Sequence, residues 1–440
     1  MVFKKQRPRV CIALPGINYR PDATLMVSNI EPLLPYLEQD FDITLVFRKT
    51  VTPPTFDWRY LTILDESQLS AKERHWTEPY FMPMNIFSAW KFSQLLNIFA
   101  QRHTSAFDVV IERQWSLVGA FSNAFERHGV PSLFVLEAEF YNRSKQPNLF
   151  KGLMKATLDR ILPTLRRHWI TSASGVILET DHMKSYLLEQ RLPIADKSVC
   201  SIPNGIDPTI FFPRDQQTCR DQLGISPQQT ILTYVGSLRR FIQEPGPLIK
   251  ALGTVGSENV ELHVIGDGTK RHELEAIAQK YSAPVIFHGR LSQKQAALYI
   301  GASDLCVAPY NKSLFQGGVF TSASLKVCEY LACARPVLSI PCDRMQHLLD
   351  GGAYGFMVEN QTENYANFFK QLPSRAALAV MANQLSEDLE HSVLAEKNIV
   401  LTWQDIAGMY KEMIWKALSA TKYSAQLETS SNSKNLVEAS

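Results

Sequence analysis

Two successive series of short apolar segments constrain the fold of this chain more than any other feature. Each series alternates strand-like runs, rich in β-branched residues, with amphipathic stretches at helical spacing. Because the runs are apolar almost throughout, they fit strands that are covered on both faces, as in parallel sheets. The sequence therefore predicts an α/β protein with two doubly wound domains of similar size. The predicted strands are Arg9–Pro15, Asp42–Phe47, Asp108–Glu112, Ser132–Glu137, Gly175–Glu179 and Val199–Pro203, followed by Thr230–Val235, Glu261–Ile265, Val285–His288, Leu305–Pro309, Pro336–Ile340 and Gly355–Val358.

The join between the two series contains an Asn-Gly turn signal and two prolines within residues 204–213. We therefore expect one domain over residues 1–205 and a second over 206–402. A helical stretch at about 403–418 follows the second series and is a candidate for packing back on the first domain. The last segment, 421–440, is rich in Ser, Asn, Lys and Glu and is expected to be a disordered tail.

Composition bounds the class of protein. The 440 residues are 45% hydrophobic and 20% charged with a net charge of +2, which is ordinary globular composition and gives no support for nucleic-acid binding. Seven cysteines are scattered without a C-x-x-C pair, as in a protein with reduced core thiols. The chain has neither an apolar run of 18 residues nor a signal-peptide core. We therefore expect a cytoplasmic protein.

Glycines and cations follow several strands of the second series. Doubly wound sheets bind ligands beyond the carboxyl ends of their strands, so with two such domains the natural site is the cleft between them. Gly236 ends one strand and Arg239 and Arg240 come just beyond it, while Gly289 and Arg290 end another. Guanidinium groups in such a place are suited to a diphosphate. The alternative, a set of solvated loop arginines, stays open at this point.

In the first series, four charged residues also stand at strand ends: Glu112, Arg113, Glu137 and Glu139. They are candidates for an acceptor-binding role, and solvated loop charges are the alternative. Gly16 follows the first predicted strand. It either lets the backbone approach a ligand closely or forms a plain strand-to-helix turn.

The stretch Thr321–Leu338 reads as a capped helix that runs into a buried strand. Ser322 or Ser324 can accept hydrogen bonds from the free amides at the helix start. Lys326 lies in the first turn, where the helix dipole disfavours a cation unless an anion is bound there too. A surface pair of Lys326 with Glu329 is the simpler alternative.

Residues 148–168 are amphipathic and basic, with Lys151, Lys155, Arg160, Arg166 and Arg167 beside one acid, Asp159. A core-facing helix with a wet basic face is the favoured interpretation. A helix that rests on an anionic membrane surface, on the inner face of the membrane, is the alternative. Pro163 is expected to kink or divide the helix.

Three landmarks, in order and at suitable spacing, resemble glycosyltransferase family 4, whose members have the GT-B fold of two Rossmann-like domains facing a cleft. The resemblance covers about residues 8–418, and its Lys326…Glu329-Tyr330 phrase looks like that of a bacterial subgroup with a Ser-Pro-x-Lys…Glu-Tyr motif. The landmarks are Ser201-Ile-Pro-Asn-Gly-Ile-Asp207 with Phe212-Pro213, His263-Val-Ile-Gly-Asp-Gly268 with Phe287-His-Gly289, and Leu325-Lys-Val-Cys-Glu-Tyr-Leu-Ala332 with Arg335-Pro-Val337.

The resemblance implies transfer of a sugar from a nucleotide-diphosphate donor to an acceptor hydroxyl with retention of configuration. By position, Glu329 would hold the ribose, Lys326 and nearby amides the diphosphate, and Arg239 or Arg240 the departing phosphate. No cofactor and no metal are expected, because cationic side chains supply the positive charge. The nucleotide-sugar-binding set is Gly16, Gly236, Ser237, Arg239, Arg240, Gly289, Arg290, Leu291, Ser324, Leu325, Lys326 and Glu329.

The chain departs from the family pattern at three places. Thr321 stands where the family commonly has a first glutamate, Ser237 where many relatives have arginine, and Ile242 and Gln243 where a lysine is common. The leading hypothesis is a glycosyltransferase of cell-surface polysaccharide or glycolipid synthesis, with a sugar or lipid-linked acceptor. A catalytically weak nucleotide-sugar-binding subunit and an epimerase of the same fold are the alternatives.

Overall fold

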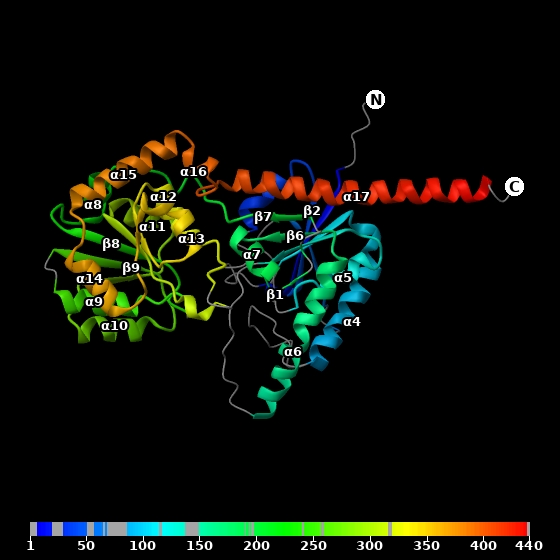
Figure 1. Ribbon diagram of the computed structural model, residues 1–440, viewed down its shortest axis with the longest axis horizontal. Coiled ribbons are helices and arrows are strands. Elements are labelled where there is room, and N and C mark those ends of the chain that lie inside the picture. Colours follow the sequence, from blue (N-terminus) through cyan, green and yellow to red (C-terminus); the bar gives the residue numbers. More distant parts are fainter. Residues whose placement is uncertain are drawn as a thin grey trace. The chain divides into compact units, whose positions relative to one another are not determined.

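The computed structural model describes residues 7–19, 30–50, 57–64, 67, 86–113, 117–136, 149–189, 191–192, 194, 198–239, 242–256, 259–315 and 319–437, without the side chains of 149–156, 158–159 and 421–437. The chain forms two compact units (Figure 1). The first unit consists of Met1–Glu137, Asn142–Pro203 and Ile406–Ser440, and the second of Ala138–Tyr141 and Asn204–Asp405.

Each unit is built on a parallel sheet, and the expectation of two doubly wound α/β units is confirmed. The first sheet has the order β3-β2-β1-β4-β5-β6-β7 and the second β10-β9-β8-β11-β12-β13. The strands of the first are β1 (Arg9–Tyr19), β2 (Asp42–Thr50), β3 (Arg59–Thr62), β4 (Val109–Glu112), β5 (Ser132–Leu136), β6 (Gly175–Leu178) and β7 (Ser198–Ser201). Those of the second are β8 (Thr230–Val235), β9 (Val260–Ile265), β10 (Val285–Gly289), β11 (Leu305–Ala308), β12 (Val337–Ser339) and β13 (Gly355–Met357).

The structure differs from the prediction at the edge and at the centre of the first sheet. The edge strand β3 was not predicted, because none of its four residues is buried and it lacks an apolar run. The central strand β1 continues to Tyr19 instead of ending at Pro15. Its register against β2 shifts between Leu14 and Asn18, so Gly16 lies in an irregular part of the strand rather than in a loop after it.

In the first unit the described part of α17 (Trp403–Val437) packs beside the sheet. Met413 approaches Gly175 of β6, and the rings of Trp415 and Phe41 pack at a tilt of 46° with their centres 5.3 Å apart. α6 (Leu149–Ser172) contains Pro163 without being divided by it. The structure continues α17 through 421–437, where only the backbone is described, instead of the disordered tail expected over 421–440. The other helices of this unit are α2 (Leu34–Leu37), α4 (Ile86–His103), α5 (Ala120–Glu126) and α7 (Asp181–Glu189).

In the second unit, helices cover both faces of the sheet (Figure 1). Alternate residues of β11 point to opposite layers: Cys306 packs with α11, α12 and α13, and Val307 packs with α9, α10 and α14. The helices of this unit are α8 (Gln216–Leu223), α9 (Gly246–Val255), α10 (Arg271–Lys280), α11 (Gln293–Ala302), α12 (Leu325–Ala332), α13 (Asp343–Leu348), α14 (Thr362–Lys370), α15 (Arg375–Glu390) and α16 (Val393–Glu396).

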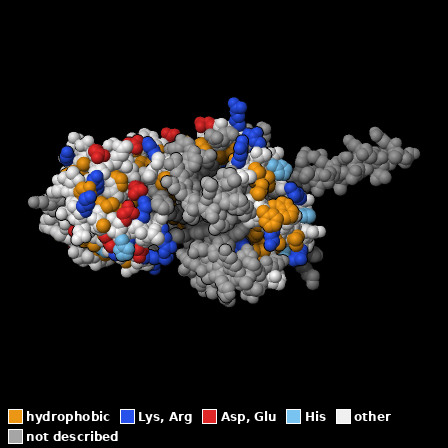
Figure 2. Space-filling model, turned by 90° about the horizontal axis from the view of Figure 1, so that it is seen from below, with side chains coloured by type: hydrophobic (Ala, Val, Ile, Leu, Met, Phe, Trp, Pro, Cys, Tyr) orange, Lys and Arg blue, Asp and Glu red, His pale blue; other side chains and the backbone are white. Residues whose placement is uncertain are grey.

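The described surface of the first unit includes apolar side chains. Figure 2 shows a group of them on one face, and the exposed large apolar residues of β3 and α4 are Tyr60, Ile86, Phe87, Trp90 and Ile98. None of the helices in the described ranges combines the length and the apolar character of a transmembrane span.

Candidate functional site

The strand order of the second sheet reverses beside β8. This strand pairs with β9 on one side and with β11 on the other, and the chain leaves the two strands toward opposite halves of the sheet. Ligands of doubly wound sheets bind at this switch point, outside the carboxyl ends of the strands. Gly236 directly follows β8, and Tyr310 lies two residues beyond β11, so both stand at the predicted place.

Lys326 reaches the switch point from the first turn of α12. Its ammonium nitrogen lies 4.2 Å from the ring centre of Tyr234 and 5.6 Å from that of Tyr310. A Cβ atom added to Gly236 would lie only 2.5 Å from the same nitrogen. Only 8% of Lys326 is exposed, so the alternative of a solvated surface pair with Glu329 does not hold for this side chain. Two aromatic faces hold the cation against a glycine backbone.

Gln243 lies beside this ammonium group. Its Oε1 atom accepts a hydrogen bond of 2.7 Å from the Tyr234 hydroxyl and would lie 2.8 Å from a Cβ on Gly236. In the region where the resemblance predicts a lysine, Gln243 therefore presents an amide oxygen near Lys326. No sequence signal marks Tyr234 and Tyr310, because both look like ordinary strand and core aromatics.

The start of α12 is not capped as predicted. Ser324 occupies the N-cap position, but its φ of 55° is left-handed and its side chain makes no capping hydrogen bond. Instead, its hydroxyl pairs with the Tyr310 hydroxyl at 2.6 Å. The Ser322 hydroxyl accepts a hydrogen bond from the Ser324 amide, one residue before the helix begins. Neither serine therefore caps the amides of the first turn, at Leu325 and Lys326, through its side chain.

Glu329 lies one turn after Lys326 on α12 and is half-buried. Burial raises the pKa of its carboxyl to about 8, and the positive charge of Lys326 opposes that shift. At neutral pH the carboxyl of the free protein is therefore mostly protonated. To accept hydrogen bonds from both hydroxyls of a diol as a carboxylate, Glu329 must first release this proton.

Three glycines end neighbouring strands at this edge. The Gly236 amide donates to the Ile265 carbonyl at 2.9 Å, and the Gly266 amide donates to the Gly289 carbonyl at 2.8 Å. Gly266 has a φ of 145°, and a Cβ there would lie 1.9 Å from the Gly236 carbonyl oxygen. The glycine pattern after β9 is therefore explained by the close approach of two backbones.

The remaining predicted residues of the second unit lie around the same edge. Ser237 is half-buried and its hydroxyl accepts from the Arg239 amide at 3.2 Å, while the Arg239 side chain is exposed. Gly289 ends β10 with a φ of 72°, Arg290 is exposed and Leu291 is half-buried. Arg240 lies outside the described residues.

Two of the four acceptor-side candidates of the first unit, Glu112 and Arg113, are buried and form hydrogen bonds with other residues of that unit. Glu112 is fully buried at the end of β4 and accepts a hydrogen bond of 2.8 Å from the Ser122 amide in α5. Arg113 is 7% exposed and donates to the Tyr410 hydroxyl of α17 at 3.1 Å. Neither is a solvated loop charge. Glu137 and Glu139 lie outside the described residues.

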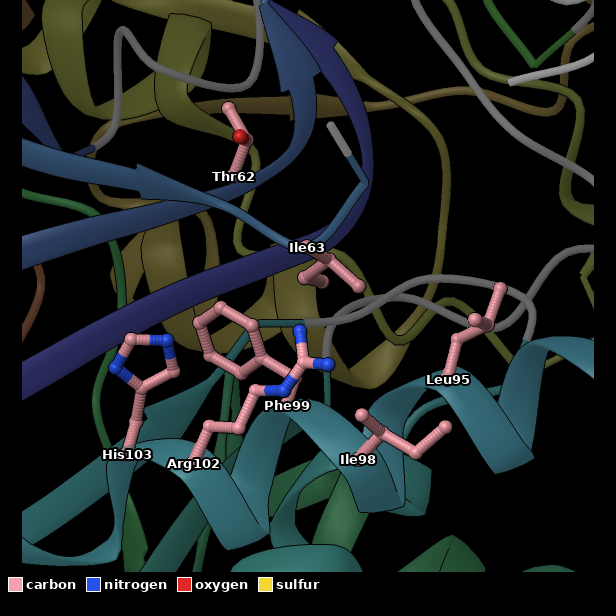
Figure 3. Close-up of a pocket in the computed structure, with 7 residues that line it drawn as sticks. All are labelled: Thr62, Ile63, Leu95, Ile98, Phe99, Arg102 and His103. Carbon is pink, nitrogen blue, oxygen red and sulfur yellow. The ribbon is translucent and has the colours of Figure 1, made fainter. Parts of the chain in front are cut away.

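The first unit also contains a cavity of about 200 Å³ between the end of β3 and α4 (Figure 3). Ile63, Leu95, Ile98 and Phe99 give it an apolar lining, with Arg102 beside the Phe99 ring in the view of Figure 3. Burial and the neighbouring Arg102 lower the pKa of His103, which also lines the cavity.

A known protein family matches part of the second unit. Residues 229–374 match the family model described as Glycosyl transferases group 1. The matched segment contains Gly236, Gly289, Lys326 and Glu329. Among curated proteins, D-inositol 3-phosphate glycosyltransferase of Stackebrandtia nassauensis is 22% identical over 331 residues, which are 70% of this chain and 69% of that protein. N-acetyl-alpha-D-glucosaminyl L-malate synthase of Bacillus anthracis is 22% identical over 167 residues, which are 37% of this chain and 41% of that protein.

Solved structures share the fold over nearly the whole chain. Sucrose-phosphate synthase of Thermosynechococcus elongatus is similar with a TM-score of 0.67 at 17% identity, covering 94% of this chain and 100% of its own. HepE of Anabaena, solved with UDP and glucose, has a TM-score of 0.63 at 14% identity, covering 93% and 99%. The family model and the first of these curated relatives are glycosyltransferases by name, so the expectation of an enzyme of this class is confirmed at that level.

Proposed function

We propose that this protein is a retaining glycosyltransferase that takes its sugar from a nucleoside-diphosphate donor bound at the switch point of the second unit. The observation that carries the proposal is the ammonium group of Lys326, which is held over Tyr234 and Tyr310 against Gly236. A compact cation beside a glycine backbone at a switch point suits a diphosphate. HepE, a structural neighbour, was solved with UDP, which is a ligand of this chemistry.

The other roles follow from position. Glu329 would hold the ribose hydroxyls, and the amides of Leu325 and Lys326 would join the Lys326 ammonium at the diphosphate. Arg239 or Arg240 would approach the departing phosphate, where a cation stabilises the charge that develops in the transition state. Residues His288–Leu291 would border the base. We expect transfer without a metal, because these groups supply the positive charge, and the acceptor to be a sugar or lipid-linked hydroxyl of a cell-surface polysaccharide or glycolipid.

The test is a donor screen followed by a transfer assay. UDP- and GDP-sugars are titrated into the purified full chain, since a ligand that binds only the native state raises its melting temperature. The donor that binds is then labelled and offered to acceptor pools, and the anomeric configuration of the product is read by NMR. Retention of configuration supports the proposal, and an inverted product contradicts it.

A matched pair of variants tests the site. Lys326→Met should weaken donor binding by roughly 10-fold to 100-fold, the worth of a charge-assisted hydrogen bond. Lys250→Met is the control, because Lys250 also lies over a tyrosine ring, 5.3 Å from that of Tyr281, but belongs to α9. Equal donor affinity in both variants would remove Lys326 from the site.

A second function is favoured by two positions. Thr321 is buried where the resemblance predicts a glutamate, and Ile242 and Gln243 occupy the region where it predicts a lysine. Both changes remove a charged group from the region of the donor. They favour a subunit that binds a nucleotide-sugar for a partner enzyme. Donor binding without hydrolysis or transfer to any acceptor pool would support this function over catalysis.

A further inference from the structure

A second cavity, with a largely polar lining, lies within the second unit. It is at the amino ends of the strands, opposite to the switch point. It has a volume of about 240 Å³ and is lined by Arg214, Asp215, Gln216, Ser303, Asp304 and Arg335, with α15 forming the remaining wall. Asp304 directly precedes β11 and Arg335 precedes β12 by two residues, so both stand at the amino ends of parallel strands. Gly236 and Tyr310 stand at the carboxyl ends. The cavity is therefore distinct from the candidate donor site.

Arg335 is the principal charged group of this cavity. It is 7% exposed, and its Nη2 atom donates to the Arg214 carbonyl oxygen at 2.9 Å. Its Nε atom is buried without a hydrogen-bond partner in the part of the chain that the structure describes. Burial lowers the pKa of the guanidinium, which reflects an incompletely compensated charge. A buried guanidinium with one carbonyl partner has capacity for an anion.

The acids in the cavity wall are already compensated. Asp304 accepts from Arg220 at 2.7 Å and from Arg375 at 3.1 Å. Asp215 caps α8 by accepting from the amide and hydroxyl of Thr218 at 2.8 and 2.6 Å, and these bonds lower the pKa of its carboxyl. Arg214 and Arg335 line the cavity itself, whereas Arg220 and Arg375 are the partners of Asp304 and lie outside its lining. Together these four guanidinium groups exceed the two carboxylates, Asp215 and Asp304, by two positive charges.

We propose that this cavity binds a small oxyanion, inorganic phosphate or the phosphate of a phosphomonoester, against the guanidinium group of Arg335. Two positive charges match a phosphate dianion, and the planar guanidinium forms paired hydrogen bonds with its oxygens. The volume is several times the roughly 30 Å³ that one water takes, so it holds a phosphate with part of an organic group. Asn383 of α15 lines the mouth, where its exposed amide can donate to the same ion.

The experiment measures phosphate binding to the full chain with the donor site blocked. Inorganic phosphate is titrated by calorimetry and by thermal shift at constant ionic strength, in saturating UDP. We expect saturable binding that stabilises the protein, as a ligand of the native state does. Lys326→Met should leave this binding unchanged, which separates the cavity from the donor site. Absence of binding at about 10 mM phosphate would overturn the proposal, since the stabilisation at that concentration should be measurable for a millimolar site.

Variants of the cavity wall test its location. Arg335→Gln should weaken phosphate binding at least tenfold. Because Arg335 is buried and this variant can lose its fold, Asn383→Asp provides the second test: it places a like charge at the exposed mouth and should also weaken binding about tenfold. Asn398→Asp adds the same charge at an exposed position outside the cavity and should change nothing. Unchanged phosphate affinity in Asn383→Asp would contradict the assignment.

A phosphomonoester arm separates the two sources of the ion. Glycerol 3-phosphate that displaces inorganic phosphate and binds more tightly assigns the cavity to an organic phosphate. Displacement with equal or weaker affinity assigns it to the free ion. Failure to displace inorganic phosphate would show that the two do not share the cavity, and the proposal would then hold for inorganic phosphate alone.

Discussion

Donor affinity should depend on pH through Glu329. Its pKa of about 8 means that the carboxyl is protonated in the free protein over most of the neutral range. If ribose hydroxyls donate to the carboxylate, the proton must leave when the donor binds. Removing it costs about 1.4 kcal/mol for every pH unit below the pKa, so this cost is about 1.4 kcal/mol at pH 7 and about 2.8 at pH 6.

The expected result is a change of roughly tenfold in the dissociation constant between pH 6 and pH 7, with a plateau above about pH 8. The ligand should be an intact nucleotide-sugar, because its diphosphate diester does not titrate in this range whereas free UDP does. Calorimetry in two buffers of different ionisation enthalpy should detect release of nearly one proton at pH 6.5. Glu329→Gln should bind more weakly at high pH, with an affinity that does not change with pH.

Two observations would refute this reasoning. One is a wild-type affinity that is constant between pH 6 and pH 8, and the other is a pH dependence that survives in Glu329→Gln. Stability supplies an independent reading. Because the folded-state pKa is raised from 4.5, the folded state binds this proton more tightly than the unfolded state. The contribution of this proton to the free energy of unfolding is therefore full below about pH 4.5 and is lost as pH rises through about 8. Glu329→Gln should abolish this pH dependence of stability.

Three further predictions follow from the structure. Gly266→Ala should lower the free energy of unfolding by about 3 kcal/mol or more in chemical denaturation, because its Cβ would collide with the Gly236 carbonyl. Gly224→Ala is the control: this glycine also has a positive φ, but its surroundings are open, so the change should cost about 1 kcal/mol. Tyr330→Phe should cost about 1–3 kcal/mol in the same measurement, since the Val235 amide donates to its hydroxyl at 2.8 Å within the core. The basic segment 148–168 can be tested by co-sedimentation with anionic liposomes at low and high salt. Salt-sensitive binding that is weaker in the double variant Arg160→Gln, Arg167→Gln would support membrane contact, and no binding at low salt would exclude it.

The strands could be predicted from sequence because a buried parallel strand leaves a local signal. All six strands predicted in the second series are present within a few residues, and β8 matches Thr230–Val235 at both ends. β3 leaves no such signal, since an exposed edge strand needs only a neighbour to pair with and no apolar face. The extension of β1 through Gly16 was missed for a related reason. An irregular register depends on the partner strand, which local sequence does not contain.

The candidate site was predictable in part. Lys326 and Gly236 were predicted to converge because strand ends of a doubly wound sheet meet at one edge, and they do. The partners that hold Lys326 were not predicted, since an aromatic residue in a strand is usually a core residue and nothing marks it as a cation partner. Ser322 or Ser324 was expected to cap α12 from residue type alone. The Ser324 hydroxyl instead pairs with that of Tyr310, which is 14 positions away and could be placed only by the fold.

The arrangement around Lys326 explains how a site that lacks three charged groups of the family pattern could still bind a diphosphate. A lysine with a mobile side chain loses rotamer freedom when it binds an anion, a cost of up to about 2 kcal/mol. Lys326 is already confined by the rings of Tyr234 and Tyr310, so this cost is met in folding instead of in binding. A second lysine at the position of Gln243 would repel it across a short distance, whereas the amide oxygen there attracts it. One confined cation, together with an exposed arginine at position 239 and the amides at the start of α12, is therefore a coherent alternative to a second lysine near Gln243. It predicts that Gln243→Lys weakens donor binding instead of restoring it.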